Sequence, residues 1–192
     1  MMDAKEGQAM HVVWRTAMSM DGKLATADHD LGFLETIEKQ DESLADFSQF
    51  VATVDSILLG AETLRWLLRG GHGWPHGDKT TWLLSHDAAL VNRVGPTAQP
   101  LNRREDVQQA LAEMEASGAR RVWLCGGGNL AGQVLALDRI DEVEVTIAPV
   151  ALGDGPALFG AMPLPERTFQ VADCRIVAGN AVLVRWMRTR QR

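Results

Sequence analysis

The stretch RVWLCGGGNLAG, residues 121–132, decides how the rest of this chain is interpreted. Residues 122–125 form an apolar run with the length and composition of a buried strand. Three glycines follow, and a helical pattern begins at Asn129. A strand that ends at glycines and continues as a helix exposes backbone N–H groups where the helix dipole favours an anion. The stretch therefore predicts a turn that binds phosphate or pyrophosphate, with a tight turn that binds nothing as the alternative.

Length and composition indicate one soluble domain. The chain has 192 residues, 46% of them hydrophobic, which is enough to bury a full core. We expect residues 1–10 to form a loose tail and residues 11–192 to form a single domain. The net charge of −6 argues against nucleic-acid and membrane partners, which require a basic surface. Both cysteines lie in strand-like apolar runs, as in proteins of a reducing compartment, so we expect a cytoplasmic location.

Apolar periodicity predicts strands that alternate with helices. The predicted strands cover residues 11–19, 56–59, 80–85, 122–125 and 143–147, and residues 167–177 and 181–187 form an antiparallel hairpin. Helices are predicted from residue 43, over 61–68, over 104–117 and from residue 129. Residues 26–40 are predicted as a long loop with room for one helical turn, and residues 70–79 are predicted as a loop. This order predicts an α/β fold with a mostly parallel sheet and an antiparallel edge.

A second junction of the same kind follows the strand at 56–59, where Gly60 precedes a helix with Thr63 in its first turn. A third strand ends at Ser85 and His86. Open α/β sheets bind ligands at the carboxyl ends of their strands, so two glycine junctions at one edge predict a cradle for a dinucleotide. A Rossmann fingerprint is less favoured, because the glycines come late and Glu142 is followed only by the terminal hairpin.

Several motifs occur in an order that resembles one superfamily. They are AMSMDGK (17–23), LG followed by Thr63 (59–63), GGG followed by Leu130 (126–130), DEV (141–143), PV (149–150), LGDG (152–155) and LF (158–159). From about residue 11 to 187 the chain resembles the dihydrofolate-reductase-like superfamily. Within it, the chain resembles the C-terminal reductase domain of the bifunctional riboflavin-biosynthesis deaminase/reductase. The resemblance implies an eight-stranded sheet and a homodimer. It also implies NADPH, with NADH as the alternative, and hydride transfer to a small pyrimidine- or pterin-like heterocycle.

The resemblance also assigns binding roles by position. The nicotinamide would lie against Ala17 and Leu24, and Phe33 stands where riboflavin-type reductases place a tryptophan that contacts the cofactor. The adenosine ribose would lie near Ser85 and His86. The pyrophosphate would lie against Gly60, Thr63, Gly126, Gly127, Gly128, Asn129 and Leu130. In dihydrofolate reductases a cis peptide joins two of these glycines. Thr146 and Asp21 are candidates for contact with the substrate, although Asp21 also fits a turn-forming role. Asp46 is the candidate catalytic carboxylate, with a place in the capped first turn of a helix as the alternative.

The chain departs from the riboflavin-type pattern at three positions. The deaminase motif is absent, which predicts a stand-alone reductase. Cys125 stands where those enzymes use a glutamate to hold the pyrimidine, so a nucleotide-binding protein without catalytic activity is the alternative function. Ala61 and Glu62 replace an arginine that often follows Gly60 and reaches the 2′-phosphate of NADPH. We expect Arg65 or His86 to compensate partly for its loss. The five histidines lack metal-ligand spacing, so no metal site is predicted.

Overall fold

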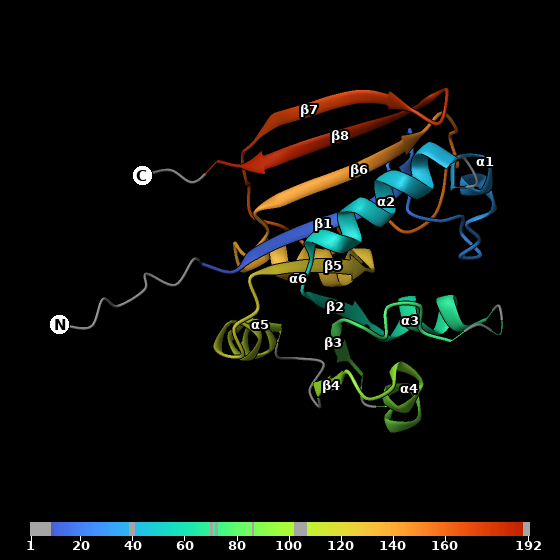
Figure 1. Cartoon of the computed structure of the whole chain (residues 1–192). Coiled ribbons are helices and arrows are strands. Elements are labelled where there is room, and N and C mark those ends of the chain that lie inside the picture. The colour runs from blue at the N-terminus through green and yellow to red at the C-terminus, as the bar shows by residue number, and fades with distance from the viewer. Residues whose placement is uncertain are drawn as a thin grey trace.

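The computed structural model describes residues 9–38, 41–69, 71, 73–85, 87–101 and 107–189. In this part of the chain a sheet of eight strands runs through the molecule in the order β4-β3-β2-β5-β1-β6-β8-β7 (Figure 1). The first six strands of that order are mutually parallel, and β8 and β7 are antiparallel to their neighbours. The strands are β1 (His11–Ser19), β2 (Ser56–Gly60), β3 (Thr80–Leu84), β4 (Ala98–Leu101), β5 (Arg121–Gly126), β6 (Glu142–Ala148), β7 (Phe169–Val177) and β8 (Ala181–Arg188).

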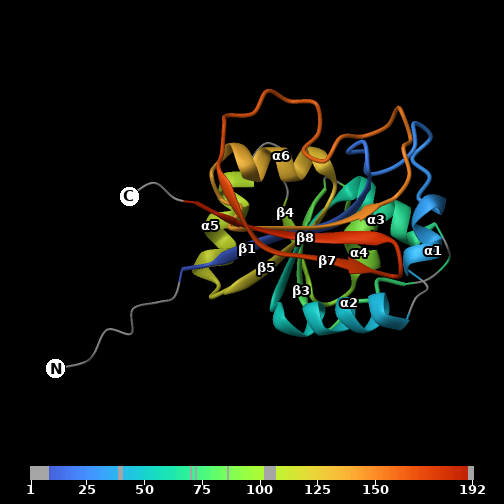
Figure 2. The same ribbon diagram turned by 90° about the horizontal axis from the view of Figure 1, so that it is seen from above.

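Helices cover both faces of the sheet. They are the 3-10 helix η1 (Gly32–Leu34), α1 (Glu35–Glu38), α2 (Asp41–Thr53), α3 (Ala61–Leu68), α4 (Ala88–Val94), α5 (Val107–Ala116) and α6 (Gly128–Ala136). Seen from above, α2 lies on one side of the sheet and α5 and α6 lie on the other (Figure 2). None of the helices in the described part is long and apolar enough to cross a membrane.

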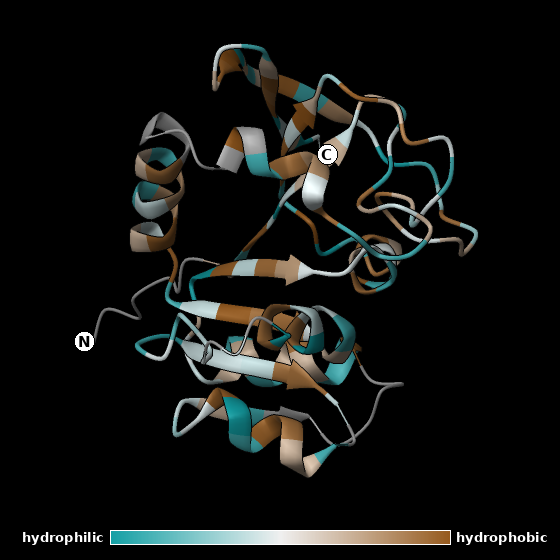
Figure 3. Ribbon diagram, turned by 90° about the vertical axis from the view of Figure 1, so that its right-hand side faces the viewer, coloured by the Kyte–Doolittle hydropathy of each residue, from teal (hydrophilic) through white to brown (hydrophobic). Residues whose placement is uncertain are grey.

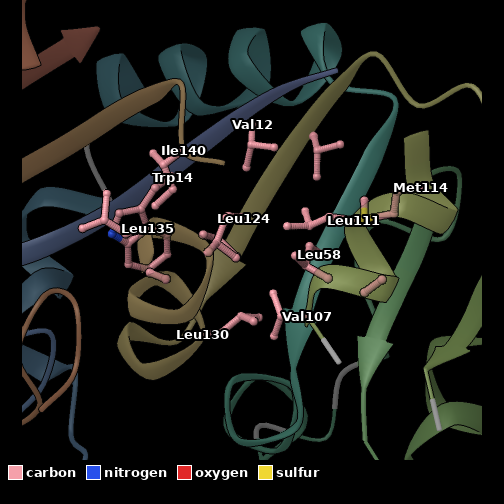
Figure 4. Close-up of a cluster of buried hydrophobic side chains, with 14 of the residues drawn as sticks. Val12, Trp14, Leu58, Val107, Leu111, Met114, Leu124, Leu130, Leu135 and Ile140 are labelled. Carbon is pink, nitrogen blue, oxygen red and sulfur yellow. The ribbon is translucent and has the colours of Figure 1, made fainter. Parts of the chain in front are cut away.

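Two large clusters of buried side chains follow from the alternation of side chains along each strand. Val12 and Trp14 of β1 face α5 and α6 and belong to the cluster of Figure 4, together with Leu58, Leu124 and Leu130. On the opposite face, β1 and its neighbours pack against α2, α3 and α4. A third, smaller cluster joins η1 and α1 to the ends of β6, β7 and β8. Figure 3 shows largely hydrophobic strands in the middle, and helices that alternate hydrophobic and hydrophilic residues as amphipathic covers do.

The predicted fold class and the eight-stranded sheet are confirmed. Two elements were not predicted, α4 and β4, and the loop predicted over 26–40 contains η1 and α1. The helix predicted from residue 43 begins at Asp41, so Asp46 lies in its second turn and is not a capping residue as the alternative required. Residues 1–8 of the predicted tail and 102–106 lie outside the described residues. Met10 is buried in the core, so the loose tail does not extend to it.

Candidate active site

The sheet order places the predicted cofactor residues along one edge, at the carboxyl ends of four adjacent strands. Ala17 lies near the end of β1, Gly126 ends β5, Gly60 ends β2, and Ser85 follows β3. Adjacent strands lie about 4.8 Å apart, so β1 and β3 are separated by about 14 Å. The arrangement therefore forms a row of consecutive sites and not an isolated turn. His86 lies outside the described residues.

The two glycine junctions touch each other, as the sequence predicted for a cradle. Leu59 pairs with Gly126, and a Cβ atom placed on Gly60 would lie 3.2 Å from the carbonyl oxygen of Gly126. Gly126 has a φ of +141°, which an L side chain rarely adopts, and a cis peptide joins it to Gly127. Thr63 completes the contact, because a Cβ atom on Gly126 would lie 3.1 Å from its Oγ1.

Both helices begin at these glycines without a side-chain cap. Gly60 is the N-cap of α3 and Gly127 is the N-cap of α6, and both have extended backbone. The carbonyl oxygen of Gly127 accepts from the N–H groups of Leu130 and Ala131 at 3.0 Å each. The preceding N–H groups, of Gly128 and Asn129, have no acceptor within the helix. The start of α6 is thus suited to an anion.

Leu130 lies in the first turn of α6 with its side chain in the core. Its N–H donates to the Gly127 carbonyl oxygen, and its side chain is 6% exposed. Asn129 is exposed, and its Oδ1 lies where a Cβ atom on Gly160 would overlap it. Leu24 also lies close to the start of α6, because a Cβ atom on Gly128 would be 3.0 Å from Leu24 Cδ1.

Asp21 organises a turn at the end of β1. Its carboxylate accepts hydrogen bonds from Ser19 Oγ at 2.5 Å, from the N–H of Leu152 at 3.0 Å and from the N–H of Gly153 at 2.7 Å. These hydrogen bonds lower the pKa of Asp21 to about 2, and the bond from Ser19 has the largest effect. The turn-forming role of Asp21 is therefore present in the structure, and it ties the end of β1 to the loop after β6.

The acid stability of the protein should report this turn. Because folding lowers the pKa of Asp21, its stabilising contribution is complete above the ordinary value of 3.8 and is lost as the pH falls through about 2. We expect the Asp21→Asn variant to have a lower thermal unfolding midpoint than the wild type, by a constant margin above pH 4 that shrinks toward pH 2. Asp28→Asn, at an exposed loop position, is the control. A margin that did not depend on pH would contradict the role of the Asp21 charge.

Ala17 and Thr146 lie side by side on the α2 face of the sheet. They are paired on β1 and β6, and both are half-buried. Phe33 packs in the same small cluster as Ala17, whereas Leu24 belongs to the cluster on the opposite face. These three predicted cofactor residues therefore flank the end of β1 from both faces of the sheet.

Asp46 and the strand residues beneath it form a network of ion pairs. The Asp46 carboxylate contacts Arg15 of β1, and its Oδ1 lies 2.6 Å from Arg175 Nη2 of β7. Arg15 Nη1 also lies 2.8 Å from Glu144 Oε1, and Arg15 and Glu144 are paired in register next to Ala17 and Thr146. Burial raises the pKa of Glu144, with Arg15 opposing the shift and Glu142 and Asp46 adding to it. The structure thus adds Glu144 as a candidate proton-carrying group.

Cys125 occupies a bulge beside the glycines. Leu58 pairs with Leu124 and Leu59 pairs with Gly126, so β2 has no residue opposite Cys125. Burial raises the pKa of its thiol to about 12, so the thiol is neutral at physiological pH. No group of histidine, cysteine and acidic residues in the described part of the chain could hold a metal ion.

Thiol labelling should distinguish the two cysteines. The thiolate is the nucleophile, so at pH 8 we expect a disulfide reagent to label exposed Cys174 quickly and Cys125 slowly. The single-thiol variants Cys174→Ser and Cys125→Ser assign the two phases, and both thiols should react quickly in denaturant. Rapid labelling of native Cys174→Ser would show that Cys125 is open to solvent.

Comparisons with known proteins agree with this geometry. The sequence pattern of the RibD C-terminal domain matches residues 10–183. The chain belongs to the RibD C-terminal domain family. The uncharacterized protein YwjB of Bacillus subtilis (strain 168) is 28% identical over 143 residues, which are 74% of this chain and 79% of YwjB.

Two crystal structures of RibD-like proteins show the same fold. A Shewanella sp. PV-4 protein assigned to riboflavin biosynthesis has a TM-score of 0.82 and 23% identity over 94% of this chain and 100% of its own. The Thermotoga maritima diaminohydroxyphosphoribosylaminopyrimidine deaminase/5-amino-6-(5-phosphoribosylamino)uracil reductase has a TM-score of 0.72 and 16% identity. That match covers 94% of this chain but 57% of the Thermotoga chain. This chain is therefore reductase-like in fold and family.

Proposed function

We propose that this chain is an NAD(P)H-dependent reductase that transfers a hydride to a small pyrimidine- or pterin-like heterocycle. The observation that carries the proposal is the row of sites along the sheet edge, from Ala17 through the two glycine junctions to Ser85. Nicotinamide, pyrophosphate and adenosine follow one another in the same order in the dinucleotide. NADPH is the proposed donor, as the resemblance implies, with NADH as the alternative.

The residues present fit such a cofactor. A Cβ atom on Gly127 would lie 3.4 Å from Thr63 Oγ1, and no other atom of the described residues comes within 4 Å of that position. Space is therefore open directly above the glycine pair, where a diphosphate would meet the uncapped starts of α3 and α6. The Thr63 hydroxyl beside it supplies a further hydrogen-bond donor.

The protein's own contribution is position and a proton. A bound reduced nicotinamide supplies the hydride. Ala17 and Thr146 lie side by side and half-buried and would hold the nicotinamide and the substrate ring against each other, and the Asp21 carboxylate fixes the loop after β6 at the end of β1. Glu144 is the group that we propose to supply the proton, because burial raises its pKa and its Oε1 lies 2.8 Å from Arg15 Nη1. Asp46 keeps the role of the candidate catalytic carboxylate, and here it holds Arg15 in place.

Binding and turnover are tested separately. Titration with NADPH, followed by nicotinamide fluorescence, should show saturable binding, and no binding at high micromolar concentration would refute the proposal. Loss of the absorbance of the reduced nicotinamide should then be followed with dihydrofolate, dihydropterins and a ribosylaminopyrimidine phosphate. Turnover of any of these identifies the substrate class.

Cys125 favours a second candidate, a nucleotide-binding protein without catalytic activity. Its neutral thiol cannot replace the charge of a glutamate that holds a pyrimidine. Binding of NADPH without turnover of any substrate in the screen would support this candidate, and turnover would remove it.

We further propose that the protein acts as a cytoplasmic homodimer. Val171 and Ile176 on the edge strand β7 are 63% and 70% exposed, and edge strands with apolar side chains favour association. Light scattering coupled to size-exclusion chromatography tests the dimer, and a monomer at micromolar concentration would contradict it.

A further inference from the structure

Three charged side chains gather at the carboxyl ends of β2 and β3. Glu62 and Arg65 lie on α3, which follows β2, and Asp87 precedes α4, which follows β3. Arg65 Nη1 lies 2.5 Å from Glu62 Oε1, and Arg65 Nη2 lies 3.5 Å from Asp87 Oδ2. Because β2 and β3 are paired, with Gly60 opposite Leu84, the guanidinium group connects the segments that follow two adjacent strands.

The two carboxylates differ in how firmly they are held. Asp87 Oδ1 caps α4 by accepting the N–H groups of Ala89 at 3.0 Å and Leu90 at 3.2 Å, and the Asp87 N–H donates to Ser85 Oγ. Asp87 is therefore fixed in place. Glu62 has a side chain that is 76% exposed, and it pairs with Arg65 within the same helix. Of the two partners, Glu62 is the one that Arg65 exchanges readily.

The three charged side chains lie at one end of the row of proposed dinucleotide sites along the sheet edge. If Ala17 marks the nicotinamide end and the glycine junctions mark the pyrophosphate, the end of β3, next in the row after β2, marks the adenosine end. NADPH and NADH differ only at the 2′ position of the adenosine ribose, where NADPH carries a phosphate. An arginine at this end binds that phosphate through parallel charge-assisted hydrogen bonds.

Magnitudes decide whether Arg65 stays with Glu62 or turns to the phosphate. An exposed ion pair between residues three apart on a helix favours the paired over the unpaired state only about twofold. Hydrogen bonds between a guanidinium group and a phosphate change affinity by about 10- to 100-fold. A 2′-phosphate bound at this position would therefore displace Glu62 from Arg65.

We propose that Arg65 selects NADPH over NADH by exchanging Glu62 for the 2′-phosphate, while Asp87 holds the guanidinium group over the ends of β2 and β3. This inference rests on the proposed dinucleotide-dependent function. In related reductases an arginine directly after Gly60 often contacts the 2′-phosphate, and here Arg65, one helical turn later, takes that role. Glu62 then competes with the phosphate for Arg65.

Dissociation constants for both dinucleotides, measured by fluorescence titration, test the proposal. Arg65→Gln should weaken NADPH binding about 10- to 100-fold and change NADH binding less than about twofold. Arg69→Gln removes the same charge from an exposed residue at the other end of α3 and should leave both constants unchanged. Glu62→Gln should tighten NADPH binding about two- to fivefold, because a competing partner and a like charge are both removed.

The outcomes separate this inference from the proposed function. Failure of the wild-type protein to bind either dinucleotide would overturn both. Binding of both dinucleotides with an affinity ratio that Arg65→Gln leaves unchanged would overturn the role of Arg65 alone. Equal weakening of NADPH and NADH would also overturn it, because Arg65 would then act on a group that the two share.

Discussion

Gly127→Ala should leave the protein folded and weaken dinucleotide binding at least about tenfold, or about 1.4 kcal/mol. Gly127 has a φ of −94°, which alanine adopts without strain, and the added Cβ atom would meet Thr63 Oγ1 at an ordinary van der Waals distance of 3.4 Å. The methyl group would instead occupy the space above the glycine pair that the pyrophosphate needs. Fluorescence titration gives the affinity, and urea unfolding gives the stability.

Gly128→Ala provides the opposite control one residue later. Its Cβ atom would overlap the carbonyl oxygen of Ala157 and lie 3.1 Å from the backbone nitrogen of Gly160. Both neighbours are backbone atoms that a side-chain rotation cannot move, so we expect this variant to lose about 3 kcal/mol of stability. Unchanged NADPH affinity in folded Gly127→Ala would refute the cradle as placed, whatever Gly128→Ala does.

These glycines could be identified from the sequence because their signal is local. Gly126 and Gly60 each stand directly between a buried strand and a helix, and the alternation of β1 and β6 is equally local. By contrast, α4 has only seven residues, of which Leu90 and Val94 are buried, so its periodicity is weak. β4 is an edge strand that contains Pro100, a residue that argues against a strand.

The ion pairs of the site could not be predicted, because they join segments that are far apart in the chain. Asp46 meets Arg15 and Arg175, which are 31 and 129 residues away. In the sequence, Glu144 is one polar residue in an alternating strand. It becomes a candidate proton-carrying group only because it and Asp46 both contact Arg15. Periodicity assigned each residue to a face of an element, but it could not show which faces meet.

Arg15→Gln should destabilise the protein by about 3 kcal/mol. Arg15 is 12% exposed, and it lies between the carboxylates of Asp46 and Glu144 and 4.6 Å from the centre of the Phe50 ring. Its removal leaves two carboxylates facing each other in a half-buried space and also ends the contact with the ring. Urea unfolding measures the loss.

Arg175→Gln is the matched control. Arg175 pairs with the same Asp46 carboxylate, but its side chain is 45% exposed, and Asp46 keeps Arg15 when Arg175 is removed. An exposed pair of this kind contributes less than about 1 kcal/mol. Equal losses in the two variants would show that the position of Arg15 between two carboxylates has no special effect.

The loss of stability caused by Arg15→Gln should also depend on pH, and the titration of Glu144 decides whether the loss is larger at high or at low pH. Folding raises the pKa of Glu144, so the folded protein binds its proton more tightly, and stability falls as the pH rises from the ordinary carboxyl value through the raised one. Without Arg15 the remaining neighbours are Asp46, Glu142 and Arg175, of which the two acids raise the pKa further. Protonation of Glu144 at low pH then relieves the repulsion. We therefore expect Arg15→Gln to lose more stability at pH 8 than at pH 5, and an equal loss at both values would show that Glu144 does not carry the proton.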